Sequence, residues 1–179
     1  MVGVGYGNFS LKPVNIYYRS ARGAPDSGEV LWMFENSSAA GDMTVTDKSG
    51  LRLYNSGPHH SPYQFHYTWH WAGSYPFEST TTGTKDTVKV HMVRSPRSGA
   101  PGTVFTVKWA SAGRTNCVFD VEIKRPGRAH YSFLKFGTTA LSGSFTPKNA
   151  GYYVIRSRMR NTKTGKFSGF SPGALIHVT

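Results

Sequence analysis

The chain has 179 residues, a formal net charge of +12 and a single cysteine, Cys117. One cysteine excludes an internal disulfide, and no apolar run approaches the roughly 18 residues of a membrane-spanning helix. Glycine, proline and aromatic residues are plentiful, while charged residues make up only 17 % of the chain. This composition favours strands and tight turns, so an all-β protein that does not enter a membrane is predicted.

The chain begins with the glycine-rich segment "MVGVGYGNFS", residues 1–10. It lacks the basic and apolar regions of a secretory signal, so synthesis in the cytoplasm is expected. Glycine loses more freedom on ordering than any other residue, and this segment is therefore too flexible to hold a shape alone. We expect an assembly arm that docks on another chain through its apolar side chains, Val2, Val4, Tyr6 and Phe9.

The region up to residue 93 contains short runs in which apolar and polar residues alternate. Examples are "VNIYY", "EVLWMF", "MTVTD" and "DTVKVHMV", and turn signals such as "DKSG" and "NSGP" separate them. Short alternating strands at this spacing are typical of an antiparallel sandwich or barrel. Residues 1–93 are therefore predicted to form a first small β-sandwich-type domain.

The run "YQFHYTWHW", residues 63–71, is the densest aromatic stretch. As a strand it places Gln64, His66, Thr68 and His70 on one side. The other side carries Tyr63, Phe65, Tyr67, Trp69 and Trp71. Five rings on one side predict a sheet core, since each ring removes about 150–250 Å² from water. The alternatives are a protein interface and an exposed platform that stacks on sugars, as in a carbohydrate-binding module.

Histidines around this stretch raise a metal-dependent enzyme as a further alternative, with His59, His60, His66 and His70 as its ligands. Strand geometry argues against it, because residues four apart on a strand are separated by about 13 Å. Two ligands of one zinc or copper ion must each lie about 2 Å from the metal. No metal site and no cofactor are therefore predicted.

Other catalytic signals are weak. "GFSPG", residues 169–173, has the spacing of a nucleophile elbow, but no helix, acid or histidine in the required order follows it. Cys117 has no histidine partner in the sequence, and the acids of residues 1–93 mostly lie beside turn residues. The sequence predicts a protein that is not an enzyme.

The composition changes at "RSPRSGAPG", residues 94–102, which is predicted to be a linker. Residues 1–93 hold seven Lys and Arg against seven acids. Residues 94–179 hold fourteen Lys and Arg, and their only acids are Asp120 and Glu122. A charge asymmetry this sharp indicates two units with different surroundings.

Residues 103–179 contain clearer strands. "TVFTVKWAS", "CVFDVEIKR", "GYYVIRSRMRN" and "ALIHVT" all alternate with a period of two. Trp109 in the first of them, the Tyr153 run and the segment "TGKFSGFSP" before the last strand together resemble a fibronectin type III domain. The resemblance implies a second β-sandwich with Trp109 and Tyr153 in its core. Ser157 and Met159 depart from the family, which usually has small or aliphatic residues at these inward positions.

The second half is expected to present its positive charge to an anionic partner. Arg156, Arg158 and Arg160 project from one side of one strand at intervals of about 6.6 Å. Further cations are expected on the same surface: Lys124, Arg125, Arg128, Lys163 and Lys166. The alternative is that cross-strand pairs with Asp120 and Glu122 absorb part of the charge. The partner is expected to be an acidic protein or an anionic host-surface glycan, because no motif for sequence-specific nucleic-acid recognition is present.

Small fibronectin-like or immunoglobulin-like domains without an export signal resemble those of bacteriophage structural proteins. This resemblance implies a non-enzymatic virion protein, a capsid decoration or tail accessory protein present in several copies. Its N-terminal half would dock on other virion proteins, and its basic half would be displayed.

Overall fold

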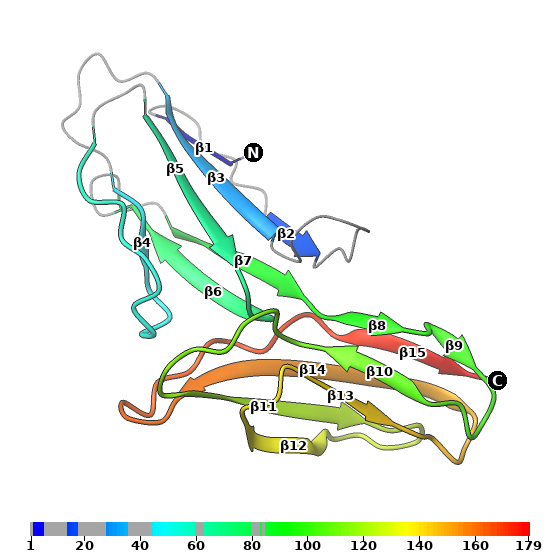
Figure 1. Ribbon diagram of the computed structural model, residues 1–179. Coiled ribbons are helices and arrows are strands. Elements are labelled where there is room, and N and C mark those ends of the chain that lie inside the picture. Colours follow the sequence, from blue (N-terminus) through cyan, green and yellow to red (C-terminus); the bar gives the residue numbers. More distant parts are fainter. Residues whose placement is uncertain are drawn as a thin grey trace.

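The computed structural model describes residues 2–5, 14–17, 28–35, 44–59, 63–79, 83 and 85–179, and every regular element in these ranges is a β-strand (Figure 1). The strands form four sheets, two in each half of the chain. The prediction of an all-β, sandwich-type protein is confirmed. No helical segment in the described ranges has the length and hydrophobicity of a membrane span.

The first half contains a three-stranded and a four-stranded sheet (Figure 1). In order across the first sheet the strands are β1 (Val2–Gly5), β3 (Gly28–Glu35) and β5 (Tyr63–Trp69). The second sheet consists of β2 (Val14–Tyr17), β7 (Lys85–His91), β6 (Gly73–Glu78) and β4 (Thr46–Asp47). Strands β6 and β7 are antiparallel neighbours, as their closeness in sequence favours.

The second half contains a three-stranded and a five-stranded sheet (Figure 1). The first consists of β13 (Ser142–Phe145), β10 (Phe105–Lys108) and β8 (Val93–Ser95). The second consists of β12 (Ser132–Thr138), β11 (Cys117–Lys124), β14 (Gly151–Asn161), β15 (Ala174–Val178) and β9 (Ser98–Gly99). This five-stranded sheet carries the candidate interaction surface.

The sequence predicts antiparallel pairing, but some neighbouring strands are parallel. The edge strands β1, β2 and β9 pair in parallel with β3, β7 and β15. Parallel neighbours need a long connection between them, and these strands are indeed joined through other parts of the sheets. Sequence alternation does not encode strand direction, which is why this feature was missed.

Apolar side chains of both halves fill the space between their sheets. Trp109 is fully buried, and its Nε1 donates to the carbonyl oxygen of Ala140 at 2.7 Å. Tyr153 is 5 % exposed and donates its hydroxyl to the carbonyl oxygen of Asn149. Ser157 and Met159, which depart from the fibronectin pattern, are both fully buried. The predicted core positions of Trp109 and Tyr153 are confirmed.

The predicted linker, residues 94–102, contains two strands that belong to the second half. Arg94 and Ser95 lie opposite Val107 and Thr106 in the ladder between β8 and β10. Ser98 and Gly99 lie opposite His177 and Val178 of β15. An edge strand bonds to one neighbour only, so it tolerates Pro, Gly and Ser and needs no apolar alternation. The linker prediction was therefore wrong for these residues.

The two halves meet along a seam of backbone and side-chain hydrogen bonds. Ser74 and Gly169 donate to and accept from each other's backbone, at 2.9 Å in both directions. Trp71 Nε1 donates to the carbonyl oxygen of Ala112 at 2.8 Å. Arg114 reaches back to the carbonyl oxygens of Leu51 and Arg52, and its guanidinium lies over the ring of Trp71. These contacts fix one half against the other.

The glycine-rich start differs from the prediction of an arm held by another chain. Residues 2–5 form β1, which pairs with Trp32–Glu35 of the same chain. A β-strand needs a neighbouring backbone, and the chain itself supplies one here. Tyr6 and Phe9 of the predicted arm lie outside the described residues.

Candidate interaction surface

The arginine stripe, Arg156, Arg158 and Arg160, projects from the side of β14 that faces away from the core. Alternation along β14 gives this arrangement, because the alternate residues Ile155, Ser157 and Met159 are fully buried. The neighbouring strand β11 places Glu122 opposite Arg156, and Asp120 opposite Arg158. The only two acids of the second half therefore lie beside the stripe.

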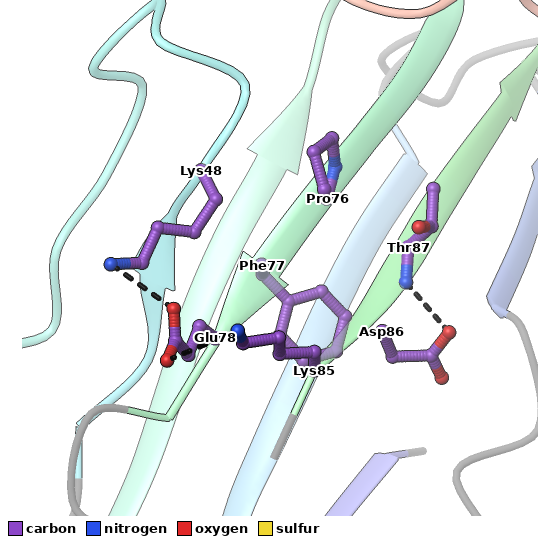
Figure 2. Close-up of a pocket in the computed structure, with 7 residues that line it drawn as sticks. All are labelled: Lys48, Pro76, Phe77, Glu78, Lys85, Asp86 and Thr87. Carbon is purple, nitrogen blue, oxygen red and sulfur yellow. Dashed lines mark hydrogen bonds and ion pairs between the residues drawn. The ribbon is translucent and has the colours of Figure 1, made fainter. Parts of the chain in front are cut away.

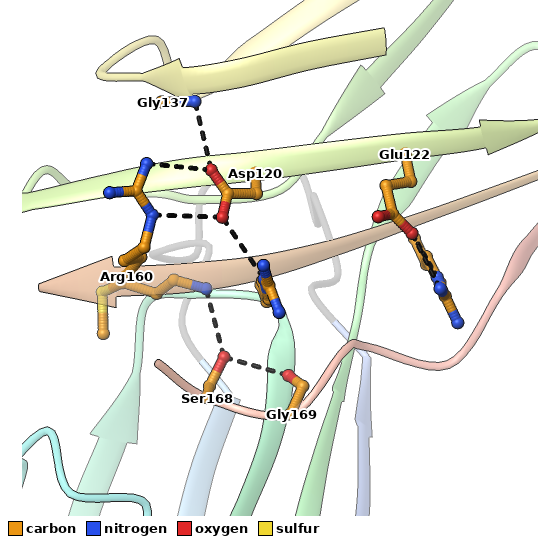
Figure 3. Close-up of polar contacts among 9 residues, drawn as sticks. Asp120, Glu122, Gly137, Arg160, Ser168 and Gly169 are labelled. Atoms are coloured by element: carbon orange, nitrogen blue, oxygen red, sulfur yellow. Dashed lines mark hydrogen bonds and ion pairs between the residues drawn. The ribbon is translucent and has the colours of Figure 1, made fainter. Parts of the chain in front are cut away.

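Both acids bind the arginines directly (Figure 3). Asp120 is fully buried and accepts from Nε of Arg158 at 3.3 Å, and from Nε and Nη2 of Arg160 at 3.2 and 3.3 Å. The backbone amide of Gly137 donates to the same carboxylate at 3.1 Å. Glu122 accepts from Nε and Nη2 of Arg156 at 2.8 and 2.7 Å.

Aromatic rings cover the same guanidinium groups. Arg156 lies between the rings of Tyr131 and Phe170, with its central carbon 3.9 and 4.0 Å from their centroids. Phe167 and Phe170 contact Arg158, and Phe136 contacts Arg160. A guanidinium is weakly hydrated and planar, so it can bind carboxylates in its plane and rings on its faces. The arginine side chains are left only 23–32 % exposed.

The prediction that these three arginines face an anionic partner was therefore wrong, and the alternative of internal pairing describes them. Of the other predicted cations, Arg125, Arg128, Lys163 and Lys166 are exposed, and Lys124 is half-buried. Arg125 donates to the hydroxyl of Ser132 at 2.6 Å. The positive surface thus lies around the stripe rather than on it.

A short segment before β15 holds the rings of Phe167 and Phe170 beside β14. In "FSGFS", residues 167–171, the hydroxyl of Ser168 accepts the Met159 amide, and the hydroxyl of Ser171 accepts the Ser157 amide, both at 3.1 Å. The backbone amides of Ser168 and Ser171 in turn donate to the carbonyl oxygens of Met159 and Ser157, at 2.9 and 2.7 Å. Figure 3 shows Ser168 below β14. The repeated Phe-Ser pair, three residues apart, is the sequence signal that could have revealed this.

We expect that replacing Ser168 with alanine lowers the free energy of unfolding by about 1–2 kcal/mol, since the buried Met159 amide loses its side-chain acceptor. Chemical denaturation measures this loss. Ser144→Ala is the matched control, because its hydroxyl bonds to Thr106 on an exposed surface and its removal is expected to cost little. Equal losses in both variants would show that the Ser168 hydroxyl has no special part in the fold.

The aromatic stretch of residues 63–71 belongs to the core of the first half, as predicted. Trp69 is fully buried and Trp71 is 7 % exposed. Tyr63, Phe65 and Tyr67 are half-buried and pack against the same core. Trp69 and Trp71 are therefore not available as an exposed sugar-binding platform, and that alternative is corrected.

The histidines of this region make separate contacts. His59 stacks on Tyr63, and its Nε2 lies 2.7 Å from the carbonyl oxygen of Ser56. His70 Nδ1 lies 3.0 Å from the hydroxyl of Ser111, whereas His66 is exposed on β5. Within the described ranges no three His, Cys, Asp or Glu side chains gather as metal ligands. His60 lies outside those ranges.

Cys117 and a pocket beside two strands of the first half are two further places that hold reactive or charged groups. Cys117 is buried, and desolvation raises the pKa of its thiol, which opposes a nucleophilic role. A pocket of about 370 Å³ opens beside β6 and β7 (Figure 2). Its one glutamate, Glu78, pairs with Lys48 at 3.2 Å and Lys85 at 3.9 Å. The pocket is lined by Lys48, Pro76, Phe77, Glu78, Lys85, Asp86 and Thr87.

No protein-family model and no curated protein match the chain. Among solved structures it is similar to the chicken interferon gamma receptor alpha chain, at 10 % identity and a TM-score of 0.38 over 85 % of this chain and 92 % of that one. The fibronectin(III)-like modules of Clostridium thermocellum CbhA show 11 % identity and a TM-score of 0.33, over 95 % and 91 %. The BSP domain of a biofilm-associated protein shows 13 % identity and a TM-score of 0.29, over 94 % of this chain and 29 % of that chain. Similarity this low carries no functional argument, and the assignment of the fold rests on the strand pairing described above.

Proposed function

We propose that this chain is a non-enzymatic structural protein of a bacteriophage particle, made in the host cytoplasm and assembled in several copies. In this proposal the first half contacts other virion proteins. The second half turns its positive surface toward an anionic partner, which is an acidic protein or a host-surface glycan.

The observation that supports the binding role is that both acids of the second half are already paired within the fold. Asp120 and Glu122 are both engaged by the arginine stripe, and residues 94–179 contain no other acid. Arg125, Arg128, Lys163 and Lys166 are exposed and have no acid of the second half left to pair with. Exposed like charges repel one another, and an anionic partner relieves that repulsion.

Two features support a structural role. The seam between the halves, with its reciprocal Ser74–Gly169 bonds, joins the sheets of the two halves. Many polar side chains of the second half serve the fold itself, as Ser168, Ser171 and Asp120 do. The assignment to a phage particle rests on the resemblance of residues 103–179 to the small fibronectin-like domains of such particles.

The test is to purify virus particles from an infected host on a density gradient and to measure this chain by quantitative mass spectrometry. We expect it in the particle band at a fixed ratio to the major capsid protein. A chain that stays in the particle-free supernatant, or that follows the cell envelope, would contradict the proposal.

A further inference from the structure

Several large hydrophobic side chains of the second half are exposed, and two of them lie on neighbouring strands of the five-stranded sheet. In the described residues the exposed large hydrophobic side chains are Val104, Phe133, Phe136, Tyr152, Phe167 and Leu175. Phe136 and Phe167 cover arginines of the stripe. Tyr152 and Leu175 do not, and they are 58 % and 46 % exposed on the central strands β14 and β15.

These two side chains form the centre of a compact patch. Tyr152 lies opposite His177, and their rings stack at 4.4 Å. In the next row Val154 lies between Leu175 of β15 and Lys124 of β11. We call Tyr152, Val154, Leu175 and His177 the Tyr152 patch.

The backbone at Gly173 packs closely against Val154 at one side of the Tyr152 patch. At Gly173 a Cβ atom would lie 2.6 Å from Cγ1 of Val154, so a larger residue there would have to displace this side chain. Tyr152 and Leu175 lie in adjacent rows of two paired strands, which makes the apolar surface continuous. Contiguous exposed apolar surface on a folded protein marks a binding site.

Positive charge lies beside the patch without a compensating acid. Lys124 shares a row with Val154, and the turn that follows it carries the exposed Arg125 and Arg128. The nearest acid on β11 is Glu122, which is held by Arg156. An apolar centre with a charged rim is the usual anatomy of a protein–protein interface.

We propose that the Tyr152 patch docks an acidic protein surface, with an apolar or aromatic side chain of the partner on Leu175 and Val154 and carboxylates on Lys124 and Arg125. This inference rests on the proposed function and deepens it by naming the partner class. A second copy of the chain is disfavoured, because two positively charged rims would face each other. The aliphatic side chains offer nucleobases and sugars no stacking platform, and one face of the Tyr152 ring is already covered by His177.

Binding to soluble polymers tests the proposal with the full chain. Fluorescence anisotropy would be measured with labelled poly-glutamate, a glutamate–tyrosine copolymer of similar length, heparin and oligo(dT), at about 150 mM salt. We expect the copolymer to bind about tenfold more tightly than poly-glutamate. Of these two polymers, only the copolymer has aromatic side chains that can contact the apolar centre. Heparin and oligo(dT) are expected to bind no better than poly-glutamate.

Substitutions test the contributions of the apolar centre and of its charged rim to binding separately. Leu175→Ser and Tyr152→Ser should each reduce the preference for the copolymer over poly-glutamate at least about fivefold. Lys124→Glu with Arg125→Glu should weaken the binding of both acidic polymers. Val104→Ser is the matched control, since Val104 is 58 % exposed outside the patch and its loss should change nothing. Melting temperatures of all variants would confirm that they are folded.

Several results would overturn the proposal. These are equal binding of all four polymers, tighter binding of heparin or oligo(dT), no binding of the copolymer, or self-association of the chain that Leu175→Ser abolishes. The particle experiment is independent of these results. A chain absent from particles that still shows the copolymer preference would remove the virion proposal and leave the docking site standing.

Discussion

Replacing Asp120 with alanine is expected to lower the free energy of unfolding by about 3–5 kcal/mol, toward the lower end because the partner arginines keep some hydration. The substitution removes the fully buried carboxylate that Arg158, Arg160 and the Gly137 amide share. Two cations would then lie side by side without their counter-charge. Urea denaturation followed by tryptophan fluorescence measures the loss.

Glu122→Gln is the matched control for this effect. Glu122 is 15 % exposed and serves a single arginine, Arg156, which the rings of Tyr131 and Phe170 also hold. Its loss should be clearly smaller than that of Asp120→Ala. If the two variants lost the same stability, or if neither lost any, the carboxylate of Asp120 would not be the centre of this arrangement.

Replacing Trp109 with alanine is the second large effect, with an expected cost of about 3–5 kcal/mol, as for other buried aromatic side chains. Trp109 is fully buried, and a Cβ placed on Gly143 would lie only 2.9 Å from its ring, so the ring fills this space tightly. The substitution would also leave the carbonyl oxygen of Ala140 without its indole donor.

Trp109→Phe separates the contribution of the ring from that of the hydrogen bond. The phenylalanine retains much of the apolar volume but cannot donate to Ala140, so an intermediate loss is expected. Thermal and chemical unfolding would be compared for both variants. A loss below about 1 kcal/mol for Trp109→Ala would be incompatible with a core position between two sheets.

Much of the fold could be predicted because strands leave a period of two in the sequence. The alternation in "CVFDVEIKR" and "GYYVIRSRMRN" identified the inward side of β11 and β14. The aromatic run of residues 63–71 identified the core of the first half for the same reason. Burial of large rings is a strong constraint that few other arrangements satisfy.

What could not be predicted depends on contacts between distant segments. The alternation of Arg156, Arg158 and Arg160 shows that they share one side, but not whether solvent, acids or rings cover it. Phe167 and Phe170 lie outside the regular strands, so no periodicity points them at the arginines. Likewise, the edge strands β8 and β9 carry no apolar pattern, and only their backbone partners identify them.

The central claim is that the arginine stripe belongs to the fold and not to a partner. The coupling free energy between Asp120 and Arg158 tests this claim most directly. Urea unfolding of Asp120→Asn, Arg158→Met and the double variant yields it from a thermodynamic cycle. A direct internal pair predicts a coupling of about 1–3 kcal/mol, because the two groups share one hydrogen-bonded network. A coupling within error of zero, with Arg158→Met as stable as the unchanged protein, would show that the arginine is free for a partner and would contradict this structure of the stripe.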